Sequence, residues 1–597
     1  MKGLLALVAC AFATSTSGAC ASRIQEAKNR TFQWGSLKAT KLPKFLTNNP
    51  LPGGTPWGKI DPATINPKNP PITGVTRRYD FVISRGELAP DGYLKKSGIL
   101  INGQFPGPTI EANWGDMIEV TVKNNITGPF EGTALHWHGL FQKGSAWYDG
   151  VPSVSQCPIA PGASFKYKFQ AGVFGTSWYH SHYSAQAAGG LFGPLIVYGP
   201  SHVDYDEDVG PVMLADWFHK DYFDIVKNVM STNSTLWANP SDNTLINARN
   251  PYNCSLVKDK NPCGTGSYSK FHFKSGRTYK LRLINSGAAG MQYFSIDGQT
   301  LQIISIDLTD IKPYNTSIVT LGVGQRSDVL FTPKVVNGTK AIWMRTLQSG
   351  KFCQRAANPE GRAIVLLDGA KDTSIPVTTA YPAPIDDGTC KNEPLENSVP
   401  HYVEELPEPS VTFQITVNTI VNKTGNQLYT MNGSPFMANY NNPLLNLAYQ
   451  KNTSYPDHPE WNVLNFGTNS SVRIVIWNNS TGPHPMHIHG HDMWILYDGN
   501  DKWDGTTVVN PANPQRRDTH NLRPKGWMVM QYNADNPGIW PFHCHIAWHL
   551  SMGMYVNLME RPGEIDQAGI PGIIAQTCDA WNKYTETNVV EQIDSGV

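Results

Sequence analysis

The sequence has no excess of charge of either sign. Its 597 residues include 48 basic and 48 acidic side chains, which gives zero net charge with neutral histidine. Balanced charge provides no attraction towards nucleic acid or an anionic membrane, so neither is expected as a partner. The chain also lacks low-complexity repeats and a phosphate-cradling loop, because Gly322-Val-Gly324 has no further glycine-rich context.

Long hydrophobic runs are absent apart from one short run near the N-terminus. Met1-Lys2 and the apolar stretch from Gly3 to Ala13 predict a secretory signal peptide over residues 1–21. The run is too short to span a membrane comfortably. We therefore expect a secreted, extracellular glycoprotein, with Asn-x-Ser/Thr sites at positions such as Asn125, Asn233, Asn337, Asn422 and Asn452.

Histidine is concentrated in four clusters, which hold ten of the 17 histidines. The clusters are His136-Trp137-His138, His180-Ser181-His182, His484-Pro485-Met486-His487-Ile488-His489, and His543-Cys544-His545 followed by His549 and Met554. One His-x-His pair alone is more often two polar residues on a solvent-exposed face. Four pairs with compatible spacing favour metal binding instead, since imidazole is a ligand for copper, iron, nickel and zinc.

The spacing within these clusters sorts the ligands into two groups. Residues i and i+2 of a β-strand share a face, so each His-x-His pair aims two imidazoles at one place, while Cys544 points away from His543 and His545. His484 is at odd spacing from His487 and His489. His549 joins Cys544 only if the strand ends near Ile546 and the chain turns. We predict two metal centres joined through Cys544.

The donor atoms suit different chemistry in the two groups. His484, Cys544 and His549 with the Met554 thioether fit a mononuclear electron-transfer copper, although a buried methionine is also ordinary core packing. Eight imidazoles are too many for one ion. Three ions that share them keep open positions for an oxygen species, whereas a structural zinc site is closed by its protein ligands.

These motifs resemble those of the multicopper oxidases, and nearly all of the chain after about residue 75 resembles the laccases of ascomycete fungi. The resemblance implies four copper ions. His484, Cys544 and His549 match type 1 ligands, and His136 and His487 match type 2 ligands. The ligands of the type 3 pair are matched by His138, His180, His182, His489, His543 and His545.

The resemblance also implies the activity, that of a laccase (benzenediol:oxygen oxidoreductase). Single electrons would come from phenols and related aromatic donors near His549, and O₂ would be reduced to water. Lignin degradation is among the implied roles, and we expect a monomer whose partners are O₂ and small aromatic substrates. Oxidases of bilirubin, ascorbate or Fe²⁺ would keep every ligand and differ only in the pocket. A non-catalytic copper-binding protein would lack a dedicated cysteine link between its centres.

Several other residues match family positions. Asp149 matches an acid beside the type 2 copper, although an Asp-Gly turn accounts for it nearly as well. Ala289 stands where some relatives have a pocket acid, and it cannot take a phenolic proton. Asp307 is a candidate substitute, but a structural role in a turn is the better interpretation. The ending Asp594-Ser-Gly-Val597 resembles the C-terminal plug of ascomycete laccases.

Short alternating runs such as 116–122 and 472–477, punctuated by Gly, Pro and Asn, predict an all-β protein. The family implies three consecutive cupredoxin-like Greek-key β-barrel domains. We assign residues 22–75 to a propeptide or loose N-terminal extension, 76–205 to domain 1, 206–387 to domain 2, and 388–597 to domain 3, which holds the type 1 copper and the plug. The irregular stretch 376–409 is the predicted linker.

Of the nine cysteines, Cys10 and Cys20 leave with the signal peptide and Cys544 is reserved for copper. An even remainder in a secreted chain predicts three disulfides, for which the sequence alone allows 15 connectivities. The family pattern favours Cys157–Cys578 and Cys353–Cys390, which leaves Cys254–Cys263.

Met554 yields a prediction, because laccases of the ascomycete group usually have leucine there, while ascorbate and bilirubin oxidases have methionine. A weak axial thioether donates electron density and stabilises Cu(II), so the type 1 potential should be lower than with leucine. Met554→Leu is expected to raise the potential in a redox titration. An unchanged or lower potential would contradict this role.

Overall fold

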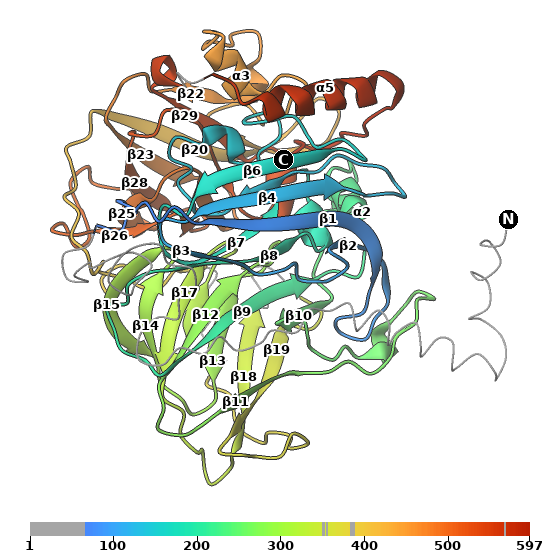
Figure 1. Ribbon diagram of the computed structural model, residues 1–597, viewed down its shortest axis with the longest axis vertical. Helices are drawn as coiled ribbons and strands as arrows, with labels where there is room; N and C mark the ends of the chain where they lie inside the picture. Colours follow the sequence, from blue (N-terminus) through green and yellow to red (C-terminus); the bar gives the residue numbers. More distant parts are fainter. Residues whose placement is uncertain (1–65, 349–352, 354–355, 383–388, 566–568) are drawn as a thin grey trace.

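The computed structural model describes residues 66–348, 353, 356–382, 389–565 and 569–597. Within these ranges, strands form three consecutive units of two sheets each (Figure 1). The all-β prediction with three cupredoxin-like domains is confirmed. The signal peptide and residues 22–65 of the predicted extension lie outside the described residues.

The first unit pairs a sheet ordered β2-β1-β4-β6 with one ordered β3-β8-β7-β5. Its strands are β1 (Thr76–Leu88), β2 (Lys95–Ile101), β3 (Ile110–Asn113), β4 (Met117–Asn124), β5 (Leu135–Trp137), β6 (Ser164–Gln170), β7 (Gly175–Ser181) and β8 (Phe192–Tyr198). Strand β6 shows how the sequence forms a sandwich. Phe165, Tyr167 and Phe169 are buried between exposed neighbours, as period-2 alternation requires.

The second unit has sheets ordered β10-β9-β12-β17-β14-β15 and β11-β19-β18-β13-β16. Its strands are β9 (Glu207–Trp217), β10 (Asn243–Ile246), β11 (Ser269–Phe273), β12 (Tyr279–Asn285), β13 (Gln292–Ile296), β14 (Leu301–Ile306), β15 (Thr309–Thr316), β16 (Val319–Leu321), β17 (Arg326–Phe331), β18 (Ala341–Gln348) and β19 (Glu360–Leu367). Both sheets contribute to its own apolar core, separate from the main one.

The third unit has sheets ordered β21-β20-β23-β28-β25-β26 and β22-β30-β29-β24-β27. Its strands are β20 (Val411–Val421), β21 (Gln427–Met431), β22 (Val463–Asn465), β23 (Ser471–Asn478), β24 (His484–Ile488), β25 (Met493–Gly499), β26 (Gln515–Arg517), β27 (Thr519–Leu522), β28 (Trp527–Asn533), β29 (Gly538–Cys544) and β30 (Tyr555–Glu560). The two strand-like runs singled out in the sequence are β4 and β23.

Within the described residues the helices are few. They are α2 (Tyr222–Val229), α3 (Leu444–Tyr449), α4 (Ala547–Ser551) and α5 (Gly572–Thr587), with 3₁₀ turns at η1 (Ala146–Tyr148), η2 (Gln186–Gly189), η3 (Ser234–Leu236), η4 (Cys254–Leu256), η5 (Pro459–Trp461) and η6 (Pro562–Glu564). Helix α5 belongs to the third unit in sequence but packs beside β6 of the first (Figure 1). The two units also share one apolar core.

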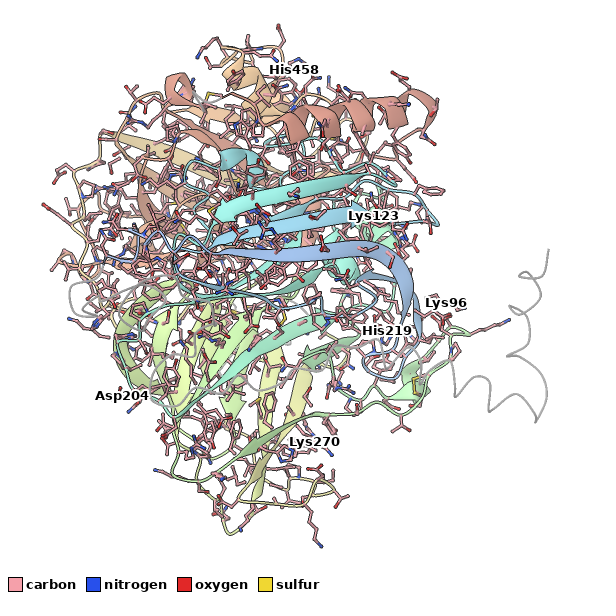
Figure 2. All side chains as sticks on the ribbon, in the orientation of Figure 1. Lys96, Lys123, Asp204, His219, Lys270 and His458 are labelled. Atoms are coloured by element: carbon pink, nitrogen blue, oxygen red, sulfur yellow. A yellow bond between two sulfur atoms is a disulfide. The ribbon has the colours of Figure 1, made fainter. Side chains whose placement is uncertain are left out.

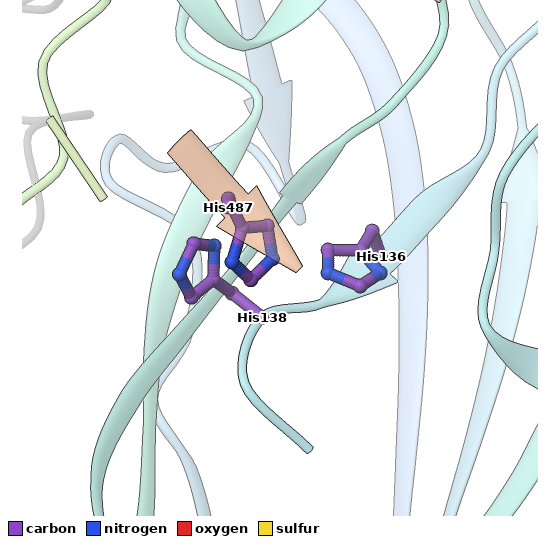
Figure 3. Close-up of side chains that lie close together, drawn as sticks. All are labelled: His136, His138 and His487. Carbon is purple, nitrogen blue, oxygen red and sulfur yellow. The ribbon is translucent and has the colours of Figure 1, made fainter. Parts of the chain in front are cut away.

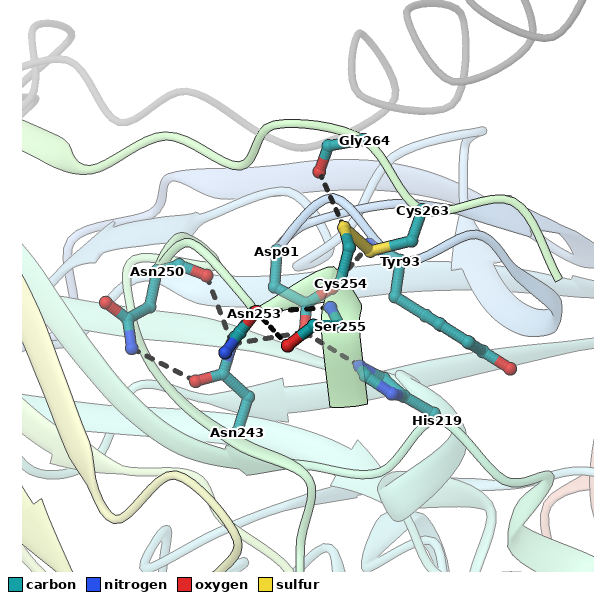
Figure 4. The surroundings of a disulfide bond; sticks show 10 residues. All are labelled: Asp91, Tyr93, His219, Asn243, Asn250, Asn253, Cys254, Ser255, Cys263 and Gly264. Carbon is teal, nitrogen blue, oxygen red and sulfur yellow. Dashed lines mark hydrogen bonds and ion pairs between the residues drawn. A yellow bond between two sulfur atoms is a disulfide. The ribbon is translucent and has the colours of Figure 1, made fainter. Parts of the chain in front are cut away.

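The structure contains all three expected disulfides. Cys157–Cys578 joins the first unit to α5 across 421 residues, Cys353–Cys390 spans 37 residues, and Cys254–Cys263 closes a loop of nine. Beneath this loop His219 hydrogen-bonds the buried Asp91 at 2.8 Å (Figure 4). Cys544 is the free cysteine among the described residues, and it is buried.

The described end of the predicted extension, residues 66–75, makes specific contacts with the first and third units. The Lys68 ammonium lies 2.9 Å from Glu404 and 2.8 Å from Asp492, both in the third unit. Thr73 donates a hydrogen bond to Asp116 of the first unit at 2.6 Å. By contrast, Lys123 and Lys270 are exposed (Figure 2). The domain boundaries remain predictions, and the one after residue 205 falls between β8 and β9.

Candidate metal centres

Two antiparallel strand pairs bring the histidine clusters together. His136 on β5 is the direct partner of His180 on β7, and His487 on β24 is the direct partner of His543 on β29. Directly opposed side chains of an antiparallel pair share a face and lie a few ångströms apart. Each sheet therefore contributes a patch of imidazoles, and the shared core of the first and third units places the two patches face to face.

The eight histidines assigned to one face form overlapping groups. Ligand atoms within each group lie within 4.8 Å of one another. The groups are His138, His180 and His545; His182, His489 and His543; and His136, His138 and His487. Figure 3 shows His138 and His487 stacked, with ring centroids 3.8 Å apart, and His136 beside them. Each group combines residues from both ends of the chain.

Four ring nitrogens in this cluster are buried and have no hydrogen-bond partner: His136 Nε2, His180 Nε2, His182 Nδ1 and His487 Nε2. Buried polar atoms are nearly always satisfied, so an orphaned set that converges on one place indicates a metal-binding site. Soft-to-borderline nitrogen donors of this kind suit copper or zinc. The residues present therefore fit bound copper ions.

Burial also sets the protonation of the cluster. It lowers the pKa of His180, His182, His489 and His543 well below the usual value, and neighbouring imidazoles lower these pKa values further. A neutral imidazole offers the lone pair that a metal needs, whereas imidazolium does not. The cluster is thus prepared to bind cations at neutral pH.

The second group contains His484, Cys544 and His549. The Cys544 sulfur lies 3.6 Å from His484 Nδ1 and 3.6 Å from His549 Nδ1, and these two nitrogens are 3.0 Å apart. Strand β29 ends at Cys544 and α4 begins at Ala547, which is the turn that the spacing of His549 requires. Met554 is fully buried, and its backbone hydrogen-bonds both Cys544 and His549.

Burial raises the pKa of the Cys544 thiol and lowers that of His549. A thiolate in this apolar setting requires a cation to offset its charge. A His₂Cys set of this kind suits a blue-copper ion. The His549 ring is the partly exposed member, while His484 and Cys544 are buried.

Asp149 lies inside the large cluster and also forms the predicted turn. Its carboxylate is 2.8 Å from His489 Nδ1 and 3.3 Å from His136 Nδ1. Gly150 follows with φ of 83°, and a Cβ there would lie 1.7 Å from the Leu135 carbonyl oxygen. The turn therefore requires glycine, and it aims the Asp149 carboxylate at two imidazoles.

Known proteins are similar to this chain over almost its full length. Multicopper oxidase family models match residues 82–202, 208–369 and 407–564. Laccase-2 of Botryotinia fuckeliana is 38% identical, with 91% of this chain and 92% of that protein covered. Oxidoreductase OpS5 of Beauveria bassiana is also 38% identical, with 91% of each covered.

The chain belongs to the multicopper oxidase family. It is of the ascomycete laccase type and is an enzyme of that class. The crystal structure of a laccase from Botrytis aclada superposes with a TM-score of 0.80 at 36% identity, covering 88% of this chain and 95% of that one. Fet3p, a multicopper oxidase that functions in iron import, gives a TM-score of 0.74 at 27% identity, with 85% and 95% covered.

Asp518 is a residue of this multicopper oxidase that the sequence did not reveal. Its Oδ1 is 3.0 Å from His138 Nε2, and its backbone oxygen is 3.0 Å from His487 Nδ1. Burial opposes its ionisation, but the charge of Arg326 holds the pKa of Asp518 well below its usual value. A lone Asp between β26 and β27 carries no spacing signal that links it to a histidine in another unit.

The structure shows the contacts of the two positions that were considered for a pocket acid, Ala289 and Asp307. The Ala289 backbone N–H donates to Asp216 at 2.8 Å, within a loop whose Ala288 carbonyl accepts from Ala547 at the start of α4. Asp307 is buried with φ of 49° and pairs with Arg517 at 3.0 Å. Asp307 therefore has the structural role in a turn that the sequence favoured.

The interface position of the cluster predicts that metal stabilises the fold. The ligands lie on or directly after β5, β7, β24 and β29 and converge only in the folded chain, so metal binding adds to the free energy of folding. A metal present at 1,000 times its Kd contributes about 4 kcal/mol. Chelated apoprotein should melt below the copper-loaded enzyme by calorimetry, and reloading should restore the melting temperature. Equal melting temperatures would count against an interface site.

Proposed function

We propose that this protein is a secreted copper-dependent oxidase. It takes single electrons from phenols and related aromatic donors at an outer site and passes them to an inner site, where O₂ is reduced to water. One observation carries the proposal. The Cys544 sulfur lies 3.6 Å from imidazole nitrogens of His484 and His549, and these three residues form the outer group. Through the backbone, Cys544 is bonded directly to His543 and His545, which belong to the inner cluster of eight histidines.

The proposed ligand sets follow the groups of side chains. His484, Cys544 and His549, with Met554 beside them, would hold one type 1 ion. His136 and His487 would hold the type 2 ion. The type 3 pair would be held by His138, His180 and His545 on one side and by His182, His489 and His543 on the other, which gives four ions in all.

Copper, when bound, supplies the one-electron redox chemistry that these side chains cannot perform themselves. The protein controls distance, access and protonation. Cys544 provides a short covalent path between the two groups. In some of these imidazoles, the ring nitrogen that does not face the proposed metal is hydrogen-bonded to a carboxylate. Asp149 contacts His489 and Asp518 contacts His138 in this way, which orients each ring and holds one tautomer.

The outer group is the proposed contact for aromatic donors. His549 has a partly exposed ring, with Tyr429 packed at a centroid distance of 4.8 Å. Trp548, the residue before it, packs edge-on against Phe218 at 5.3 Å. Tyr429, Trp548 and Phe218 are almost completely buried, so they support the histidine from within and leave the His549 ring as the proposed point of contact for a phenol. Ala289 offers no base in this region, so the phenolic proton would pass to solvent.

Reduction of O₂ also consumes protons, and Asp149 is the proposed source at the inner site. It is buried and lies between His136 and His489. A carboxylic acid in this position is within reach of an oxygen species through one water. Asp149 is therefore proposed to relay protons as well as to orient imidazoles.

Secretion is supported by two features of the surface and the covalent framework. Disulfides persist in oxidising compartments, and the described part of the chain contains three. Asn125, Asn233, Asn337 and Asn452 are exposed, as glycosylated asparagines must be. Among the described helices, none combines the length and apolar character needed to cross a bilayer.

Fe²⁺ oxidation is the second candidate, because Fet3p functions in iron import and shares this fold. Rates of O₂ uptake with phenols, Fe²⁺, ascorbate and bilirubin separate the possibilities. We expect the highest kcat/KM with phenols. A preference for Fe²⁺ would keep the copper chemistry of the proposal and replace its donor.

Cys544→Ser tests the central link. The variant should lose its blue absorbance and its O₂ uptake on a phenol, while circular dichroism remains that of the folded protein. The double variant Cys254→Ser/Cys263→Ser is a control that also loses cysteines, but from a surface loop, and it should keep both signals. A colourless wild-type protein with full metal content, or one copper ion where four are expected, would contradict the proposal.

A further inference from the structure

The second unit, called the middle unit below because it lies between the other two in sequence, contributes no histidine to the outer group or the inner cluster. It nevertheless contacts the inner cluster. Its backbone passes beside the cluster at residues 322–325, which connect β16 to β17. Gly324 has φ of 86°, and a Cβ there would lie 3.0 Å from His545 Cδ2 and 3.1 Å from His138 Cε1. The backbone of the middle unit therefore packs directly against two imidazoles from the other two units.

Arg326, at the start of β17, continues this contact as a buried ion pair. Its guanidinium binds the Asp518 carboxylate through two parallel bonds, Nη1 to Oδ1 at 2.7 Å and Nη2 to Oδ2 at 2.6 Å. Both side chains are almost completely buried. A bidentate arginine–carboxylate pair fixes orientation as well as charge. Asp518 cannot rotate without breaking both bonds.

The held carboxylate in turn fixes two ligand rings. Asp518 Oδ1 is 3.0 Å from His138 Nε2 and accepts a hydrogen bond from the Thr519 hydroxyl at 2.9 Å. The same hydroxyl is 3.1 Å from His487 Nδ1, the side of that ring opposite its unpartnered Nε2. His138 uses Nε2 here, which leaves Nδ1 facing His545 Nε2 at 3.2 Å.

Arg326 is itself held on the other side, so the pair has little freedom to shift. Asp307 accepts from the Arg326 backbone N–H at 3.0 Å and from the Thr519 N–H at 3.2 Å. Arg326 Nε donates to the Thr176 carbonyl of the first unit at 3.1 Å. Gly139 leaves the necessary room, since a Cβ there would lie 2.5 Å from Asp518 Oδ2.

We propose that Arg326 is a positioning residue for the inner metal cluster, and that it acts through Asp518 to fix the rings of His138 and His487. The middle unit is therefore a working part of the oxygen-reducing site although it supplies no ligand. This inference rests on the proposed function for the identity of the metal.

Arg326→Lys tests this positioning role, because lysine keeps the positive charge and loses the bidentate hydrogen bonding to Asp518. Loss of a partner that orients a metal ligand typically lowers metal affinity about 10- to 100-fold. After dialysis against a chelator, the variant should retain less type 2 copper and show an altered type 2 signal in electron paramagnetic resonance. Its blue absorbance, which reports Cys544, should be unchanged.

Arg345→Lys is the matched control. Arg345 also lies in the middle unit and binds a buried carboxylate through two bonds, to Asp297 at 2.9 and 3.0 Å, but no described contact connects it to the histidines. It should reproduce any general loss of stability and keep its type 2 copper. Equal copper loss in both variants, or a wild-type signal in Arg326→Lys, would overturn the proposal.

Two further variants keep the test decisive. Asp518→Asn should cause copper loss that does not add to that of Arg326→Lys, because both break one chain of contacts; additive losses would overturn the proposal. If Arg326→Lys does not fold, Asp307→Asn should give a smaller loss of the same kind, and a folded variant with full copper retention would overturn it. A wild-type enzyme without type 2 copper would instead refute the proposed function.

Discussion

The pairing of β24 with β29 is the constraint on which the metal centres depend. It sets His487 opposite His543 and Met486 opposite Cys544, so one register decides which side chains face the inner cluster and which face the outer group. A slip of one residue would exchange the faces and separate the ligands of β24 and β29 from their partners. The same backbone pairing therefore both stabilises the sheet and fixes the relative positions of the ligands.

The first and third units are joined more strongly than their distance in sequence implies. They share an apolar core, and the disulfide between Cys157 and Cys578 fastens α5 to the first unit. The last four residues are also buried, with the Asp594 carboxylate accepting from Ser184 at 2.7 Å and from Ser551 at 3.0 Å. Covalent and polar links thus surround an interface whose centre is polar and metal-binding.

The sequence predicted the part of this arrangement that local periodicity controls. The two-residue spacing of His543 and His545 places them on one face and Cys544 on the other. The same motif indicated a turn before His549. It could not predict Asp518 or Arg326, because each is a single charged residue whose partner lies more than a hundred positions away. Gly324 carried no sequence signal of its contact either, because that contact depends on rings from two other units.

The ion pairs of Lys68 have a consequence for maturation. This ammonium lies between Glu404 and Asp492 and also lines a cavity of about 320 Å³ whose wall includes Asp518. A protease that trimmed the chain at the proposed boundary after residue 75 would remove the cation and leave two carboxylates at that opening. The processed and unprocessed forms would then differ in the electrostatic potential of this cavity, beside a carboxylate that contacts His138, with no change in any proposed metal ligand.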